Sequence, residues 1–445
     1  MTGIAQVLPS PAGRVLMLAG GKPDSFYSDY IIWPVVKILV LLFIILTLVA
    51  YLVYLERKVS AFIQARLGPM RVGPWGLLQP AADGLKLLLK EDIIPLKADK
   101  IVFAIAPIIA VVSALVVLAV VPWGPAWATI ANVNIGLLFI LAVSSVGVLG
   151  LVLSGWSSNS KYSLLGALRS SAQMVSYEVG MGLSIIGALM FARTLSMNGI
   201  VEAQLADRVW YVFFQPLGFL VYVVAALGET NRAPFDLPEA ESELVAGYHT
   251  EYSGFRWALF FMAEYTAMIV TSAVAVTLYL GGWSLFGVEH VFSNPTMRVV
   301  FGIVIFSLKI ALLIYLYMWF RWTFPRYRYD QLMDLGWKWL IPAGLANIVL
   351  TGVWYVLAMP KTEGGVLNLL RPGASDRYQF APWSGKLYFI VTGCFVTVPL
   401  VWALLTAINR RSRTFNLHAQ RQLQIQLRQE RLGKRAEAQP AETAP

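Results

Sequence analysis

Long apolar runs, each close to twenty residues, constrain the fold of this chain more than any other feature. A helix rises about 1.5 Å per residue, so such a run matches a hydrocarbon core about 30 Å thick, whereas a membrane β-strand is about half as long. With 58% hydrophobic and 13% charged residues, the 445-residue chain also has too little polar surface for a soluble globule. The sequence therefore predicts an all-α protein that crosses a membrane several times.

The apolar runs predict about nine transmembrane helices. They cover residues 33–55, 101–121, 134–154, 172–192, 209–228, 256–280, 300–320, 339–359 and 386–408. The predicted organisation is an N-terminal extension on the outer side (1–32), a membrane domain (33–360), an outer loop (361–385), an additional transmembrane helix (386–408) and a basic tail (409–445).

Basic residues concentrate on one side of the predicted membrane. With the N-terminus outside, the inner loops and the tail hold 24 of the 35 lysines and arginines, and the outer segments hold 10. This bias follows the positive-inside rule, so we expect the long loops and the tail to be cytoplasmic. It also accounts for the net charge of +10 without a nucleic acid partner. The Arg- and Gln-rich tail fits either a docking helix or a solvated segment that fixes topology.

Few residues in the chain are suited to bind metals. Cys394 is the single cysteine, and the histidines are His249, His290 and His418. These cannot build a thiolate or imidazole cluster, and no glycine-rich fingerprint opens a helix after a strand. We therefore expect no metal, iron–sulfur or nucleotide site in this chain, and we expect any redox groups to belong to partners.

Carboxylates inside apolar runs are the first candidate functional residues. Glu178 lies about six residues into the fourth predicted span, Glu264 about eight into the sixth, and Glu229 at the end of the fifth. Burying a charge costs several kcal/mol, so such groups pair, face water or become neutral. Proton relay is the functional interpretation, and a static ion pair, for example with Lys309, is the structural alternative.

The loop after the fifth span carries further acids. These are Glu239, Glu241, Glu243 and Glu251. The segment from Asp236 to Glu239 is typical of a helix start with a capping box, which makes Asp236 structural. In that helix Glu239 and Glu243 lie at i and i+4, where like charges repel and can share a proton. The acids therefore indicate a proton path that opens on the inner side.

The first inner loop, residues 56–100, combines charges with two Gly-Pro turns. Its second half is amphipathic and includes Asp83 and Lys86. We expect helices that lie on the membrane surface, broken by turns. Such a segment could line a lateral entrance for an amphipathic, lipid-soluble ligand, and interfacial anchoring alone is the alternative.

Four long strings resemble the H subunit of respiratory complex I, whose mitochondrial counterpart is the ND-one subunit. They are ERKVSAFIQARLGPMRVGPWGLLQPAADGLKLLLKE, SGWSSNSKYSLLGALRSSAQMVSYEV, GETNRAPFDLPEAESELVAGYHTEYSGFRWALFFMAEY and FPRYRYDQLM, in order between Trp33 and Pro360. The resemblance implies an eight-helix core that encloses much of a quinone chamber. It also implies antiporter-like membrane partners, and peripheral-arm partners that form the rest of the quinone site and carry FMN and iron–sulfur clusters. The ninth helix and the tail depart from the family pattern.

The resemblance also implies two sets of site residues. The quinone chamber would include Glu56, Arg57, Arg66, Asp83, Arg232 and Phe235. The proton path would include Glu178, Glu229, Glu239, Glu241, Glu243 and Glu264. Glu251 matches a family acid with a less defined role. No catalytic centre would be complete in this chain alone.

Two other functions compete with this interpretation. A secondary transporter would show inverted repeats, and the chain has no matching halves. The membrane subunit of a proton-translocating hydrogenase would dock a nickel enzyme instead, and the complete first-loop string favours the quinone enzyme. The expected location is a bacterial plasma membrane.

Overall fold

The computed structural model describes residues 32–124, 128–207, 209–236, 246–286, 288 and 294–358. These residues form helices and connecting turns, with no strand among them. Six of the helices are long and apolar enough to cross a membrane, and a seventh, Pro216–Glu229, is apolar but shorter. The predicted class, an all-α polytopic membrane protein, is confirmed. The predicted ninth helix (386–408), the loop before it (361–385) and the tail (409–445) lie outside the described residues, so the count of nine stays a prediction.

The structure gives the following helical elements, in chain order. They are α3 (Trp33–Ile63), η2 (Pro74–Gly76), α4 (Gln79–Leu89), α5 (Lys100–Val117), α6 (Gly136–Ser157), α7 (Lys161–Ala192), α8 (Met197–Asp207), α9 (Tyr211–Phe214), α10 (Pro216–Glu229), η4 (Gly247–His249), α12 (Gly254–Tyr279), α13 (Pro295–Thr323), α14 (Tyr329–Leu335), the π-helical turn η6 (Gly336–Leu340) and α15 (Ile341–Ala358).

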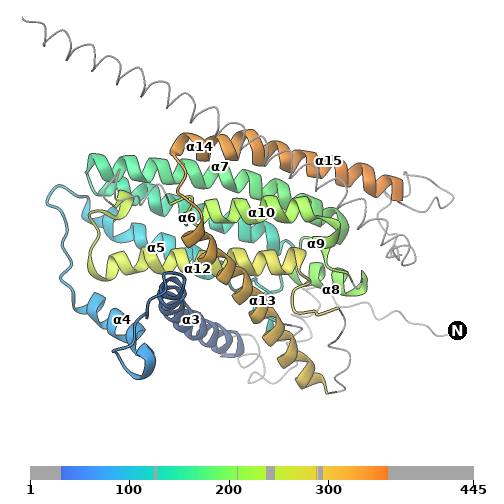
Figure 1. The fold of residues 1–445 in the computed structure, drawn as a ribbon, viewed down its shortest axis with the longest axis horizontal. Coiled ribbons are helices and arrows are strands. Elements are labelled where there is room, and N and C mark those ends of the chain that lie inside the picture. Colours follow the sequence, from blue (N-terminus) through green and yellow to red (C-terminus); the bar gives the residue numbers. More distant parts are fainter. Residues whose placement is uncertain are drawn as a thin grey trace, which may run out of the picture. The chain divides into compact units, whose positions relative to one another are not determined.

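A layer of roughly parallel helices forms the centre of the described region (Figure 1). Helix α5 packs along α6 and α12, and α7 packs against α6, α10 and α15. Helix α13 crosses α12 obliquely, and α3 contacts α4, α12 and α13. Helix α12 is the most enclosed of the long apolar helices. Charged residues reach this region from α3, α7, α10, α12, α13 and the turn after α10.

Two helices extend beyond their predicted spans by eight residues or more. Helix α3 continues to Ile63, and α7 begins at Lys161 although its span was predicted from residue 172. The first half of α7 is rich in serine and lacks an apolar run, but some of its polar side chains form tertiary hydrogen bonds. The Ser163 hydroxyl donates to the Tyr248 carbonyl at 3.0 Å, and the Gln173 amide donates to the carbonyls of Gly228 and Phe235, both at 2.9 Å.

The fifth predicted span is not one helix. The chain forms α9 and α10 with a break at Gln215, whose φ and ψ are −129° and 51°. Proline lacks a backbone N–H and disfavours helical geometry in the residue before it, so Pro216 starts a new helix. The prediction of a continuous helix over 209–228 was wrong in this detail, and α10 is correspondingly short.

Candidate functional site

Arg232, in the turn after α10, bridges two carboxylates from different helices. Its Nη1 atom lies 3.1 Å from Oε1 of Glu56 on α3, and its Nε atom lies 2.6 Å from Oε1 of Glu264 on α12. The contact between Arg232 Nε and Glu264 is an ion pair, and its angles are not those of a hydrogen bond. The three side chains are only 4%, 8% and 14% exposed, respectively. Burial on this scale strengthens their attraction and makes the loss of any one charge costly.

Glu56 receives further donors from α12 and α13. The Tyr265 hydroxyl donates to Glu56 Oε2 at 2.5 Å, and the Arg321 guanidinium donates to Oε1. The Tyr265 ring also lies 4.2 Å from the guanidinium carbon of Arg232, within cation–π distance. Glu56, Arg232, Glu264, Tyr265 and Arg321 therefore form one connected cluster, which we call the arginine bridge. It ties together α3, α12, α13 and the turn after α10.

The rest of that turn is packed beside the arginine bridge. Phe235 is buried, with its ring 5.4 Å from that of Tyr177 and stacked at 5.7 Å on that of Tyr327. Asp236 Oδ2 lies 3.6 Å from Arg326 Nη2. Burial raises the pKa of the Asp236 carboxyl, and nearby arginines, including Arg232, oppose the rise. The helix that Asp236 was predicted to cap lies outside the described residues.

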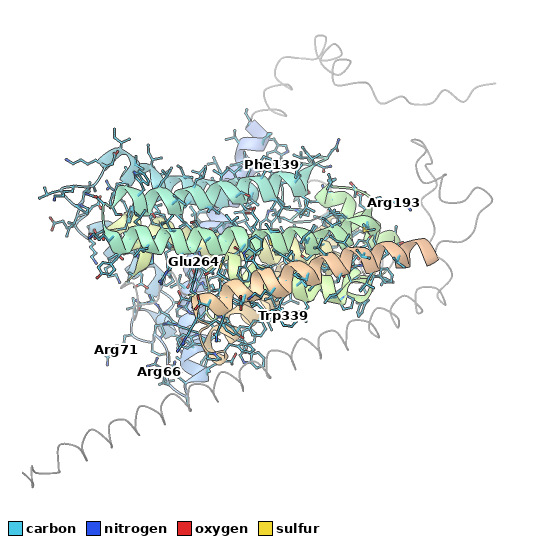
Figure 2. The ribbon with its side chains drawn as sticks, turned by 90° about the horizontal axis from the view of Figure 1, so that it is seen from above. Arg66, Arg71, Phe139, Arg193, Glu264 and Trp339 are labelled. Atoms are coloured by element: carbon cyan, nitrogen blue, oxygen red, sulfur yellow. The ribbon has the colours of Figure 1, made fainter. Side chains whose placement is uncertain are left out.

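A cavity connects two of the predicted proton-path acids. Both Glu229 and Glu264 line it, together with polar side chains of α5, α6, α12 and the turn after α10: Ser113, Ser144, Thr271 and Asn231. Its volume is about 90 Å³. One water molecule needs about 10–15 Å³ of such space, so the cavity has room for several. Glu229 and Glu264 thus line the same cavity inside the helix bundle, and most of the other lining residues are apolar (Figure 2 labels Glu264).

Glu178, on α7, contacts α6, a helix that also contributes residues to the cavity lining. Its Oε1 atom accepts a hydrogen bond from the Ser145 hydroxyl, and the neighbouring Ser144 lines the cavity. Glu178 is also near enough to Glu229 for their charges to interact. The structure therefore brings Glu178, Glu229 and Glu264 into one region, whereas Glu239, Glu241 and Glu243 lie outside the described residues.

The remaining predicted chamber residues lie on the surface around α4. Arg57 Nη1 contacts Asp83 Oδ2 at 2.7 Å, and Gln79 donates to the other oxygen of Asp83 at 3.1 Å. Arg66 is exposed at the periphery (Figure 2). Glu56 and Arg57 are neighbours in sequence, but on a helix they point about 100° apart, so one enters the arginine bridge and the other reaches α4.

Glu251 is not part of the arginine bridge, and it is partly buried in the turn between η4 and α12. The nearby His249 packs edge-on against the Tyr248 ring. Burial lowers the pKa of His249 to about 4, so this histidine is neutral at pH 7. Among the described residues, no group of three or more His, Cys, Asp or Glu side chains is placed to hold a metal ion.

Comparisons with known proteins identify the family. The sequence model of a family described as NADH dehydrogenase matches residues 36–352. An NADH-quinone oxidoreductase H subunit of Geobacter metallireducens is 50% identical over 352 residues, which cover 75% of this chain and 97% of the relative. The H subunit of Bacillus mycoides is 49% identical over 335 residues, covering 75% and 96%. An H subunit of Koribacter versatilis is 46% identical over 401 residues, covering 75% and 93%.

The chain belongs to the family of NADH-quinone oxidoreductase H subunits. Members of this family are membrane subunits of an oxidoreductase complex, so the resemblance carried by the four sequence strings is confirmed. The relatives carry this name consistently, which argues against the transporter and hydrogenase interpretations.

Sequence reasoning missed two members of the arginine bridge. Tyr265 directly follows Glu264, and Arg321 lies at the end of the seventh predicted span. An arginine at that position is equally expected from the positive-inside rule, so no local signal marked it. Lys309, considered as a partner for a buried glutamate, donates instead to carbonyls after α12, and Arg232 forms the ion pair with Glu264.

Proposed function

We propose that this member of the family encloses part of the quinone chamber of an NADH-quinone oxidoreductase and links it to a path for protons. Quinone would be the substrate. FMN and iron–sulfur clusters would reside in partner subunits, and the reduction would be completed with peripheral-arm subunits. The complex would lie in a bacterial plasma membrane, with the long loops and the tail on the cytoplasmic side and antiporter-like subunits alongside.

The arginine bridge is the observation that carries this proposal. Glu56 belongs to the set assigned to the chamber and Glu264 to the set assigned to the proton path, and Arg232 contacts both. Reduction of a quinone near Glu56 would change the local charge. The strength with which Arg232 attracts Glu264 would then change as well, because the same guanidinium contacts both carboxylates. The contacts of Arg232 would therefore couple the charge in the quinone chamber to Glu264 in the proton path.

The proton path would continue from Glu264 through the cavity to Glu229 and Glu178. The cavity has room for several water molecules, and its mostly apolar lining includes hydroxyl groups and two carboxylates. These groups would support proton transfer, because protons move along hydrogen-bonded water and carboxyl groups. Glu239, Glu241 and Glu243 would extend this path toward the cytoplasmic side. A static ion pair accounts for the contact between Glu264 and Arg232. It does not explain why Glu264 and Glu229 line the same cavity.

The Arg57–Asp83 pair and Arg66 would form the entrance for quinone. Helix α4 has no buried residue, and it exposes Leu85, Leu88 and Leu89 beside this charged pair. A surface with both apolar and charged groups fits a ligand with a polar head and a hydrocarbon tail. Phe235, packed next to the arginine bridge, would lie deeper than these residues.

Purification of the tagged chain from its native membrane tests the proposal. We expect co-purification of a complex that contains FMN, oxidises NADH and reduces quinone. A photoreactive quinone should label segments that include α3 or the turn after α10. Co-purification of a nickel enzyme, or of the chain by itself, would contradict the proposal, as would labelling restricted to partner subunits.

Replacing Arg66 by alanine is expected to impair quinone entry. We expect the KM for a short-chain quinone to rise about threefold or more, because a charged contact to the head group is worth about 0.5–1.5 kcal/mol at a partly exposed site. NADH–ferricyanide activity, which bypasses quinone, should be unchanged in the assembled complex. Arg71→Ala, at another exposed arginine of the same loop, is the matched control. Equal quinone kinetics in both variants and in the native complex would remove Arg66 from the entrance.

A further inference from the structure

The Lys309 ammonium is held by three backbone carbonyls. Its Nζ atom donates to the carbonyls of Leu280, Gly282 and Ser284 at 2.6, 2.9 and 2.7 Å. It also lies 4.4 Å from the centre of the Trp210 ring. An ammonium group has three donors, and the carbonyls offer one acceptor to each of them. These contacts offset the cost of placing a lysine in the middle of an apolar helix.

The chain after α12 is shaped closely around this ammonium. Gly281 and Gly282 have φ values of 74° and 53°, in the left-handed region that favours glycine. A Cβ atom at Gly281 would lie 2.5 Å from the Trp210 ring, and one at Gly282 would lie 2.5 Å from a methyl group of Val201. The turn thus directs alternate carbonyls, those of residues 280, 282 and 284, to one point. The C-terminal end of α12, where the helix dipole also favours a cation, lies just before it.

We propose that this turn is a cation-binding cage, built for a primary ammonium group and filled by Lys309 of α13. Within the part of the chain that the structure describes, the three carbonyls and the Trp210 ring form the walls of the cage. In the native protein the ligand is the protein's own side chain, and the cage fixes the end of α12 to the middle of α13. A variant without the lysine ammonium would bind a small primary alkylammonium ion from solution.

The cage also positions the helices that carry the arginine bridge. Helix α12 carries Glu264 and Tyr265 about 24 Å from the cage by helix rise, and α13 carries Arg321 about 18 Å from Lys309. The two helices are therefore connected at two separate places, by carbonyls at the cage and by the side chains of the arginine bridge. Because the cage holds the end of α12 against the middle of α13, a rearrangement of the arginine bridge would tilt the two helices about the cage. It would not slide one helix past the other. Lys309 is in this sense a positioning residue for the proposed coupling.

Replacement of Lys309 by alanine, tested in the whole complex, separates the cage from general packing. We expect a lower midpoint of thermal unfolding and an NADH–quinone turnover reduced about fivefold or more, since three charge-assisted hydrogen bonds are lost together. Addition of ethylammonium should restore a large part of both. Tetramethylammonium has the same charge but no N–H donor, and it should restore neither. The adjacent Leu308→Ala, at an exposed position on α13, is the matched control.

Each result decides for or against the cage. Native stability and turnover in Lys309→Ala without added ammonium would overturn it, and so would equal recovery with tetramethylammonium. If Lys309→Ala does not assemble, assembly in cells grown with ethylammonium becomes the measurement, and failure to recover there overturns the cage. The thermal midpoint and its recovery do not depend on quinone reduction, so the cage can fail while the proposed function holds, and the reverse.

Discussion

Replacing Arg232 by glutamine is expected to cause the largest loss of function of any single change in this chain. The substitution leaves Glu56 and Glu264 buried, with Arg321 as the remaining guanidinium beside them. Removing one partner of a buried ion pair costs about 3–5 kcal/mol, because the other charge stays in a medium that solvates it poorly. We therefore expect NADH–quinone turnover to fall at least about tenfold and the amount of assembled complex to decrease. Quinone reductase activity and native gel electrophoresis measure the two effects.

A second substitution separates the two effects of losing Arg232. In Arg232→Gln combined with Glu264→Gln, the surplus carboxylate is removed together with its partner. We expect assembly to recover and turnover to stay low, because the link between Glu56 and Glu264 is still missing. Recovery of both would mean that the arginine is needed only to neutralise charge.

Arg256 provides the matched control for Arg232. Among the described residues it pairs with Asp92 at 3.0 Å, and the two side chains are 25% and 39% exposed. Such a pair is worth about 0–1 kcal/mol, so Arg256→Gln should leave turnover within about twofold of native. An equal loss in Arg256→Gln and Arg232→Gln would show that the bridging position has no special role.

The membrane helices could be predicted from the sequence because hydropathy is a local property. The run from Lys100 to Val117 is apolar enough to identify by itself, and the predicted start of that helix differs by one residue. The first half of α7 could not be predicted in this way, because some of its polar side chains pair with distant backbone groups such as the Tyr248 carbonyl. The break before Pro216 had a local signal, but the apolar character on both sides of the proline favoured one continuous span.

Most residues of the candidate site could be predicted from the sequence, but Tyr265, Arg321 and the contacts could not. Glu178 and Glu264 stand out because carboxylates are costly in apolar helices, and that cost can be recognised from sequence. The contact between Glu56 and Arg321 joins residues 265 positions apart, so it depends on how α3 and α13 pack. The different directions of Glu56 and Arg57 follow from helix geometry, but they became predictable only once α3 was known to continue beyond residue 55.

Replacing Glu178 by glutamine is expected to stop proton transfer while preserving the local structure. The Ser145 hydroxyl donates to Glu178 Oε1, and a glutamine carbonyl can accept the same hydrogen bond. Glutamine cannot release or accept a proton, whereas aspartate keeps the carboxyl group and only shortens its reach. We expect quinone-linked turnover and proton pumping to fall about tenfold in Glu178→Gln and by less than about half in Glu178→Asp, with assembly near native in both.

The comparison of Glu178→Gln with two further variants separates proton chemistry from packing. Ser145→Ala removes the hydrogen bond but keeps the carboxyl group, so pumping should continue. Glu202→Gln, at an exposed position of α8, shows the effect of losing a carboxylate away from the cavity. NADH–quinone and NADH–ferricyanide activities in membrane vesicles, proton uptake and the amount of complex are measured together. Normal pumping per NADH at normal turnover in Glu178→Gln would exclude this residue from the proton path. Loss of assembly in that variant, with Ser145→Ala equally affected, would instead mean that Glu178 serves to hold α6 and α7 together.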